Sequence, residues 1–148
     1  MYVRGAQGCV IVCDILDESS LKSTLKWKDL IINDPFFQDC AHLVDDPIPI
    51  ILVQNKIDLR RKDDTLDFAT PDYLEKFAKD NNFFASFQTS AKTSENLKDV
   101  FEVLVEEILA RKIARLKKQI NDLNEKKRRG SSDLKSLING QTEKKKCC

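Results

Sequence analysis

The sequence predicts an α/β fold, with a parallel sheet of three strands, flanking helices, a long C-terminal helix and a flexible tail. Three short and almost wholly apolar segments alternate with longer segments whose apolar residues recur at helical spacing. Continuous apolar runs are typical of strands buried on both faces, and their alternation with helices favours a parallel sheet. Right-handed crossovers then place the first two helices on one face and the last helix on the other.

The strand candidates are residues 8–16 (GCVIVCDIL), 50–54 (IILVQ) and 83–88 (FFASFQ). Each is bounded by polar residues that end the apolar run. Cys9 and Cys13 stand at even spacing in the first strand, so they share one face of it and are expected to be core thiols.

Helical segments follow each strand candidate. The first spans residues 18–33, with Asp17 or Ser19 as its N-cap. The second runs from Thr70 to about residue 81, because a capping hydroxyl, a proline and an acid in this order form a strong start signal. The third begins near Ser94.

The third helix shows one amphipathic stripe, with a break in its spacing between positions 108 and 113. The stripe comprises apolar residues at positions 97, 101, 104, 108, 113, 116, 120 and 123.

After about residue 128 the sequence is polar and has no sustained period, which predicts a flexible tail. The domain organisation is expected to be residues 1–120, followed by a basic tail of residues 121–148.

Charge is distributed unevenly along the 148 residues. Residues 111–148 carry a net charge of +9 and residues 1–110 a net charge of −8, so an acidic domain precedes a basic segment.

No apolar run reaches the roughly 18 residues needed to span a membrane, and the N-terminus does not have the pattern of a signal peptide.

Cysteine and histidine usage argues against a disulfide framework or a metal site. Cys40 falls in an expected loop and indicates no function, and His42 is the only histidine. Neither a metal site nor a catalytic residue is therefore predicted. Cys147 and Cys148 end the chain as a pair.

Polar clusters follow the second and third predicted strands. Asn55, Lys56 and Asp58 follow one strand, and the Thr-Ser-Ala-Lys run of residues 89–92 follows the other. Ligands in parallel α/β sheets bind at the carboxyl ends of the strands, so the two clusters converge if the strands are neighbours. A carboxylate there can accept two hydrogen bonds from the ring N–H and the exocyclic amine of guanine. Adenine lacks these donors, and a site left with unpaired polar groups rejects the wrong ligand by a factor of about 10⁴.

These motifs resemble those of the Rab branch of the small Ras-like GTPases, which have a P-loop NTPase fold. The guanine-specificity motifs of this family are NKxD and SAK, and this chain has NKID and TSAK in the same order. The opening YVRGAQGCVIVCDI, the LKWK and PIP segments and the final Cys-Cys pair are also similar to Rab sequences.

The resemblance implies that six residues bind the guanine base. Asp58 would accept hydrogen bonds from the ring N–H and the amine. Asn55 would contact the other edge of the base and tie the two loops together, and Ser90 would orient Asp58. The six residues are Asn55, Lys56, Asp58, Ser90, Ala91 and Lys92.

The other implied roles concern the faces of the base and the carbonyl of guanine. Lys56 and Lys92 would flank the base and the ribose, since lysine stems lie along apolar surfaces while their ammonium groups stay solvated. Ala91 would offer its backbone N–H to the guanine carbonyl. The family binds GTP and GDP, hydrolyses GTP and acts as a switch in vesicle trafficking.

The resemblance covers only the C-terminal part of a Rab protein. The four glycines, Gly5, Gly8, Gly130 and Gly140, complete neither a G-x-x-x-x-G-K-S/T loop nor a D-x-x-G motif. Residues 1–148 are therefore expected to correspond to a Rab from just after its second switch region to its end. Guanine nucleotide binding is expected to be weak or absent, Mg²⁺ to belong to the full-length protein, and enzymatic activity is left open. Met1 is either an internal methionine or the start of a short form.

The Cys-Cys ending implies a lipid anchor. In the family, such cysteines carry prenyl groups, so Cys147 and Cys148 are expected to be lipidated. Two lipid chains give stable anchoring. The implied location is the cytoplasmic face of an intracellular organelle membrane, and the implied partners are guanine nucleotide and the Rab-type escort and effector proteins.

Two other functions are compatible with the sequence. The chain could be a non-catalytic, membrane-tethered interaction module in which a helix over residues 111–127 docks a partner. It could also bind nucleic acid through its KKRR and KKK runs. The basic segment has no aromatic residue that could stack on bases, so nucleic acid is not expected as a partner.

Overall fold

The computed structural model describes residues 6–33, 48–60 and 66–142, and for residues 128–142 it describes the backbone only. The chain forms two compact units, Met1–Leu109 and Ala110–Cys148, which are described separately. The elements in chain order are β1 (Cys9–Asp14), α1 (Glu18–Ile32), β2 (Ile50–Asn55), the 3-10 helices η1 (Ile57–Leu59) and η2 (Asp67–Ala69), α3 (Pro71–Asp80), β3 (Ala85–Thr89) and α4 (Leu97–Thr142).

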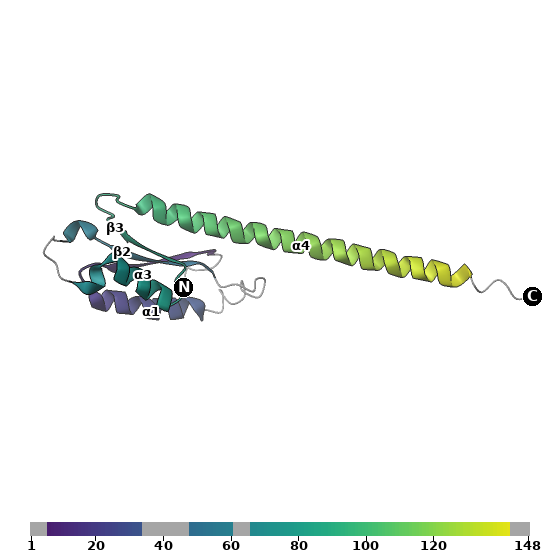
Figure 1. The fold of residues 1–148 in the computed structure, drawn as a ribbon, viewed down its shortest axis with the longest axis horizontal. Helices are drawn as coiled ribbons and strands as arrows, with labels where there is room; N and C mark the ends of the chain where they lie inside the picture. The colour runs from purple at the N-terminus through teal and green to yellow at the C-terminus, as the bar shows by residue number, and fades with distance from the viewer. Residues whose placement is uncertain (1–5, 34–47, 61–65, 143–148) are drawn as a thin grey trace, which may run out of the picture. The chain divides into compact units, whose positions relative to one another are not determined.

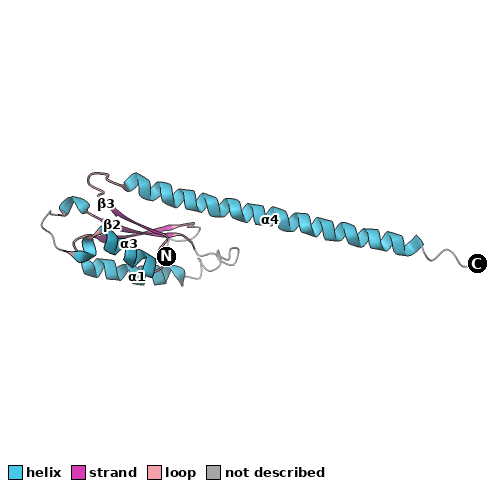
Figure 2. Cartoon of the chain, viewed as in Figure 1, coloured by secondary structure: helices cyan, strands magenta, loops and turns pink. Residues whose placement is uncertain are grey.

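The predicted parallel sheet of three strands is confirmed. The described strands lie in the order β1-β2-β3, and both neighbouring pairs are parallel. The central strand β2 is buried along nearly its whole length, as its continuous apolar sequence predicted. Figures 1 and 2 show the strands with α1 and α3 on one side of them.

One hydrophobic cluster lies between the sheet and the helices α1 and α3. Leu52 of the sheet is fully buried there against Leu21 of α1 and Leu74 of α3. Cys13 is buried in this cluster, which confirms the prediction of a core thiol at this position. Cys9 is only partly buried and packs against the same cluster. Burial raises the pKa of Cys13 to about 12, with smaller contributions from nearby carboxylates. The Cys13 thiol is therefore inert at neutral pH.

The second cluster lies on the other face of the sheet, where the first turns of α4 pack. Ile51 and Val53 contact Val100 and Leu104 there, as the predicted crossover directions required. Gly8 leaves room for the side chain of Leu104, because a Cβ at that position would lie 2.8 Å from Leu104 Cδ1.

Within the first turns of α4, which pack against the sheet, the predicted stripe is wrong at one position. The stripe was expected to include position 101, but Phe101 is 59% exposed and Val100 is buried in its place. The helix also begins at Leu97 and not near Ser94. Ser94 and Asn96 have positive φ values of 64° and 57°, which a right-handed helix cannot contain.

The predicted caps of α1 and α3 are present. The carboxylate of Asp17 accepts a hydrogen bond from the backbone N–H of Ser19 at 2.9 Å, so Asp17 is the N-cap of α1. The hydroxyl of Thr70 accepts from the N–H of Tyr73 at 3.3 Å, and Pro71 occupies the first turn of α3.

The prediction of a flexible tail after residue 128 is wrong for residues 128–142, which continue α4 to Thr142. Glycines inside the helix, Gly130 and Gly140, each cost about 1 kcal/mol relative to alanine. Once a helix is nucleated, each added residue gains one backbone hydrogen bond, so propagation outweighs isolated poor helix formers. Residues 143–148, with Cys147 and Cys148, lie outside the described residues, as do Cys40 and His42.

Both outer strands of the described sheet have one edge without a neighbouring strand. On β1, the side chain of Val12 is 58% exposed. An unpaired strand edge favours pairing with other chains. Among the described helices, none has an apolar stretch long enough to cross a membrane.

The first prediction compares two apolar positions of the sheet. We expect Leu52→Ala to lower the free energy of unfolding by about 2–5 kcal/mol, because it leaves a cavity at a fully buried site. Val12→Ala, at an exposed site, should change it by less than about 0.5 kcal/mol. Urea denaturation followed by circular dichroism measures both, and equal losses would contradict the described burial.

Candidate functional site

The ends of the three strands lie side by side. Residue Asp14 of β1 is paired in register with Asn55 of β2, which is paired with Thr89 of β3. Because the strands are parallel, the loops that follow them leave the sheet at the same edge. The two polar clusters found in the sequence, residues 55–58 and 89–92, are therefore brought together.

The carboxylate of Asp58 is held by the neighbouring loop. The hydroxyl of Ser90 donates a hydrogen bond to Asp58 Oδ1 at 2.6 Å, and Lys92 Nζ lies 3.9 Å from Asp58 Oδ2. Ser90 is fully buried and the side chain of Asp58 is 14% exposed. The same hydroxyl accepts from the backbone N–H of Thr93 at 3.2 Å. The carboxylate thus has a fixed direction and keeps lone pairs available for a ligand.

Asn55 connects the two loops through its side-chain oxygen. Asn55 Oδ1 accepts hydrogen bonds from the backbone N–H of Ala91 at 3.0 Å and from the hydroxyl of Thr89 at 3.2 Å. The Ala91 N–H, which the resemblance assigned to a guanine carbonyl, is therefore already engaged within the protein. A ligand carbonyl would have to share it with Asn55.

Lys56 has a left-handed backbone conformation, with φ 73° and ψ 34°, at the turn between β2 and η1. Its ammonium group donates to Asp14 Oδ2 at 2.7 Å, and Asp14 Oδ1 accepts from the backbone N–H of Leu16 at 2.9 Å. The hydrogen bond from Lys56 lowers the pKa of Asp14, and the same bond raises the pKa of Lys56. Asp14 therefore holds the lysine in one direction.

The loop after β3 is closed by its own backbone. Ser90 and Glu95 form an isolated antiparallel bridge, with the Ser90 N–H donating to the Glu95 carbonyl at 3.2 Å. Asn96 donates through Nδ2 to the carbonyl of Gln88 at 2.8 Å. These bonds fix the turn that presents residues 90–92.

Sequence reasoning did not assign a role to Asp14 or to Thr89. Both end a strand at the edge where Asn55 ends β2, and each contacts a predicted site residue. The position of a polar residue at a strand end was the signal that could have identified them. The structure brings all six predicted residues to this edge, through Asn55, Lys56 and Asp58 on one loop and residues 90–92 on the other.

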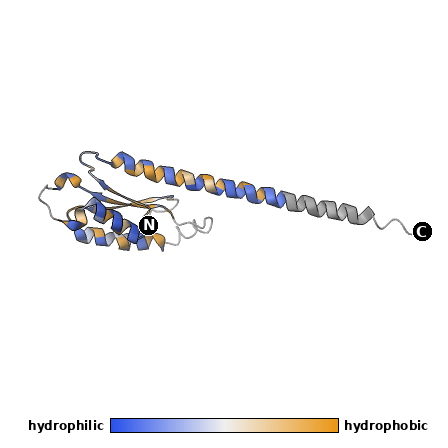
Figure 3. Ribbon diagram, in the orientation of Figure 1, coloured by the Kyte–Doolittle hydropathy of each residue, from blue (hydrophilic) through white to orange (hydrophobic). Residues whose placement is uncertain are grey.

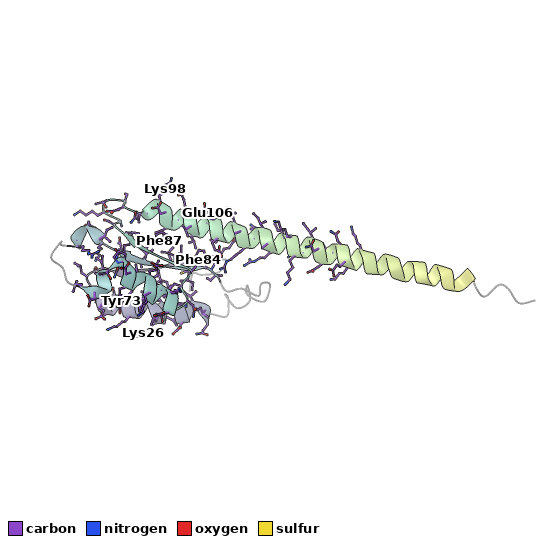
Figure 4. All side chains as sticks on the ribbon, viewed as in Figure 1. Lys26, Tyr73, Phe84, Phe87, Lys98 and Glu106 are labelled. Carbon is purple, nitrogen blue, oxygen red and sulfur yellow. The ribbon has the colours of Figure 1, made fainter. Side chains whose placement is uncertain are left out.

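A separate groove of about 750 Å³ lies between α3 and β3. It is lined by Leu74 and Ala78 from α3 and by Phe84 and Phe87 from the strand region. Figure 4 labels Phe84 and Phe87 among the side chains of this part. The groove contains none of the six predicted site residues, so it is not the site described above.

Within the described ranges, no three His, Cys, Asp or Glu side chains group in a way that could hold a metal ion. The arrangement of the loops instead offers one oriented carboxylate, one amide side chain and two lysine stems. Such a set suits a planar, hydrogen-bonding ligand with polar edges.

Comparison with known proteins finds a matching family model and several relatives. The Ras family model matches residues 1–110. The Ras-related protein Rab-32 of Mus musculus is 36% identical over 111 residues, which cover 74% of this chain and 45% of that protein. Rab-32A of Dictyostelium discoideum is 31% identical over 116 residues, covering 78% of this chain and 49% of that protein.

A more distant relative is the Ras-related protein Rab-7L1 of Homo sapiens, which is 26% identical over 109 residues, covering 74% of this chain and 49% of that protein. The chain thus spans about half the length of the curated relatives it matches.

The second prediction concerns the pair of Asp14 and Lys56. Lys56→Met should raise the pKa of Asp14 towards its ordinary value of about 3.9, because the hydrogen bond that favours the carboxylate is lost. In the unchanged protein, this contribution to stability is present above the ordinary pKa and is lost as pH falls through the lowered one.

Carbon-13 NMR titration of the Asp14 carboxyl group measures the shift. Lys22→Met is the matched control, since Lys22 pairs with Glu18 and does not contact Asp14. An unchanged Asp14 pKa in Lys56→Met would show that the two side chains are not paired.

Proposed function

Since the chain belongs to the Ras family and, within it, to the Rab small GTPases, we propose that residues 55–58 and 89–92 recognise the guanine base of GTP and GDP. One observation carries the proposal: the Asp58 side chain is 14% exposed, and its carboxylate is oriented by the Ser90 hydroxyl at 2.6 Å. An oriented, partly buried carboxylate matches the paired donors on one edge of guanine.

Asp58 supplies the discrimination between guanine and adenine. Guanine donates to the carboxylate through its ring N–H and its amine, and these are charge-assisted bonds. Adenine has an acceptor nitrogen in place of the ring N–H, so it would leave the carboxylate desolvated and unpaired. The resulting penalty is the basis for rejection by a factor on the order of 10⁴ in sites of this kind.

The remaining residues hold the base from its sides. The stems of Lys56 and Lys92 flank the two faces of the base and the ribose, while their ammonium groups stay near Asp14 and Asp58. Asn55 keeps the two loops at a fixed separation and contacts the far edge of the base. Ala91 shares its N–H between Asn55 Oδ1 and the guanine carbonyl.

At the level of the whole protein, we propose GTP binding, GTP hydrolysis and a switch function in vesicle trafficking. Most nucleotide affinity in this kind of site comes from backbone N–H groups, a lysine and Mg²⁺ around the phosphates. The 148 residues contain no G-x-x-x-x-G-K-S/T loop. Residues 1–148 by themselves are therefore expected to bind guanine nucleotides weakly and to hydrolyse no GTP above background.

We further propose that Cys147 and Cys148 carry prenyl groups and that the anchored protein lies on the cytoplasmic face of an organelle membrane. Escort and effector proteins of the Rab type are the proposed partners. Three lysines, Lys144 to Lys146, precede the cysteines. Each should add about 1 kcal/mol of attraction to an anionic leaflet.

The third prediction tests base recognition. Asp58→Asn should weaken GDP binding and improve binding of xanthosine diphosphate, because an asparagine amide can donate to the carbonyl that replaces the guanine amine. Ser90→Ala should weaken GDP binding less, since it removes only the group that orients the carboxylate. Titration of the unchanged protein and both variants with fluorescent nucleotides, at protein concentrations suited to weak binding, measures these affinities.

Asp80→Asn, at the exposed end of α3, is the control that removes the same charge elsewhere. GDP binding that is equally weak in Asp58→Asn, Asp80→Asn and the unchanged protein would refute the base-recognition assignment.

The fourth prediction concerns the lipid anchor. Mass spectrometry of the C-terminal peptide from the native cell should show two added prenyl groups, and Cys147→Ser with Cys148→Ser should release the protein from membranes. Free thiols at both positions in the native protein would rule the anchor out.

A further inference from the structure

The described part of α4 beyond residue 109 has four exposed apolar side chains at a regular spacing. Ile113, Leu116, Ile120 and Leu123 are separated by three, four and three residues and are 52%, 52%, 56% and 59% exposed. Figure 3 shows hydrophobic positions recurring between hydrophilic ones along this part of the helix. We name these four residues the seam. Leu109, four residues before Ile113, is also exposed, at 51%.

The seam has the spacing of a coiled-coil heptad. Ile113 and Ile120 occupy the a positions, and Leu116 and Leu123 occupy the d positions. Isoleucine at a with leucine at d favours a parallel, two-stranded coiled coil. If the heptad is continued along the sequence, its next a and d positions hold a lysine at 127 and a glycine at 130. The a and d positions after these hold leucines at 134 and 137.

The seam is narrow, because the flanking e and g positions are all polar. A stripe restricted to a and d is the signature of a coiled-coil seam, and a helix that lies in a membrane surface has a broader apolar face with aromatic residues. The flanking residues are Lys112, Lys117, Gln119, Asn124 and Lys126.

The flanking charges decide between a second copy and a different partner. In a parallel pair, the g position of one helix faces the next e position of the other. Lys112 of one copy would then face Lys117 of the other, and no flanking position of the described seam is acidic. Like charges at these positions disfavour the homodimer and favour a partner with acidic residues there.

We propose that residues 109–126 form one strand of a parallel, two-stranded coiled coil with a helix of another protein that has apolar a and d positions and acidic e and g positions. The isolated seam leaves apolar area in contact with water, and the partner removes it. The interaction uses no residue of the base site, so it does not depend on nucleotide binding.

The fifth prediction tests this pairing with residues 1–148 and a synthetic helical peptide of about four heptads, which covers the roughly two and a half heptads of residues 109–126 and extends beyond them. The peptide has isoleucine at a, leucine at d and glutamate at e and g. Fluorescence anisotropy of the labelled peptide should show saturable binding that weakens at high salt. A second peptide with lysine at e and g should bind at least about tenfold more weakly.

Variants of the chain test whether the seam, and not another face of the helix, binds the peptide. Leu116→Asn combined with Ile120→Asn should abolish binding, and Asn121→Ala, on the outer face of the same helix, should leave it unchanged. Lys112→Glu combined with Lys117→Glu should reverse the preference towards the lysine peptide. This reversal cannot arise from loss of folding.

The proposal is overturned by no binding of the acidic peptide, by equal binding of the two peptides, by an unreversed preference in the charge-swapped variant, or by a homodimer of the unchanged chain in sedimentation equilibrium. If phosphatidylserine vesicles displaced the acidic peptide from the seam, the seam would be a membrane-binding surface. This result would also overturn the proposal.

Discussion

The parallel register of β2 against both of its neighbours is the constraint on which the candidate site depends. It brings Asp14, Asn55 and Thr89 into one row at the carboxyl edge of the sheet. A shift of one residue would move the side chains of a strand to opposite faces and separate the two loops. Two buried clusters, one on each face of β2, make such a shift unfavourable. The apolar sequence of the strand therefore determines the position of polar groups beyond its end.

Hydrogen bonds between the loops convert this alignment into a preorganised site. The Ser90 hydroxyl is buried and reaches Asp58, and Asn55 reaches Ala91 and Thr89. Groups held in place before a ligand arrives do not have to be ordered on binding, which increases affinity and selectivity. The left-handed backbone of Lys56 is an unfavourable conformation for a residue with a Cβ, and the bond to Asp14 fixes the direction of its side chain.

Sequence alone predicted the features that depend on short-range patterns. Apolar runs located the three strands, and the capping residues Asp17 and Thr70 located the starts of two helices. The start of α4 depended on positive φ values at Ser94 and Asn96, which composition and periodicity did not indicate. The burial of Val100 in place of Phe101 depended on how the helix packs against the sheet. The tail was misjudged because its polar composition suggested disorder, although propagation from a formed helix carries α4 to Thr142.

For the site, the spacing of NKID and TSAK identified the loops, because residues that follow neighbouring parallel strands must converge. The contact between Lys56 and Asp14 was not predictable in the same way, since it joins residues 42 positions apart through a lysine whose direction depends on its backbone. The engagement of the Ala91 N–H by Asn55 likewise depends on the exact separation of the two loops.

NMR titration of residues 1–148 with GDP and with ADP tests whether this edge of the sheet recognises guanine. GDP should shift the backbone signals of Asn55, Asp58, Ala91 and Lys92 in a saturable way, and ADP at the same concentrations should leave them unchanged. Equal shifts with both nucleotides, or GDP-dependent shifts confined to the groove between α3 and β3, would contradict the claim.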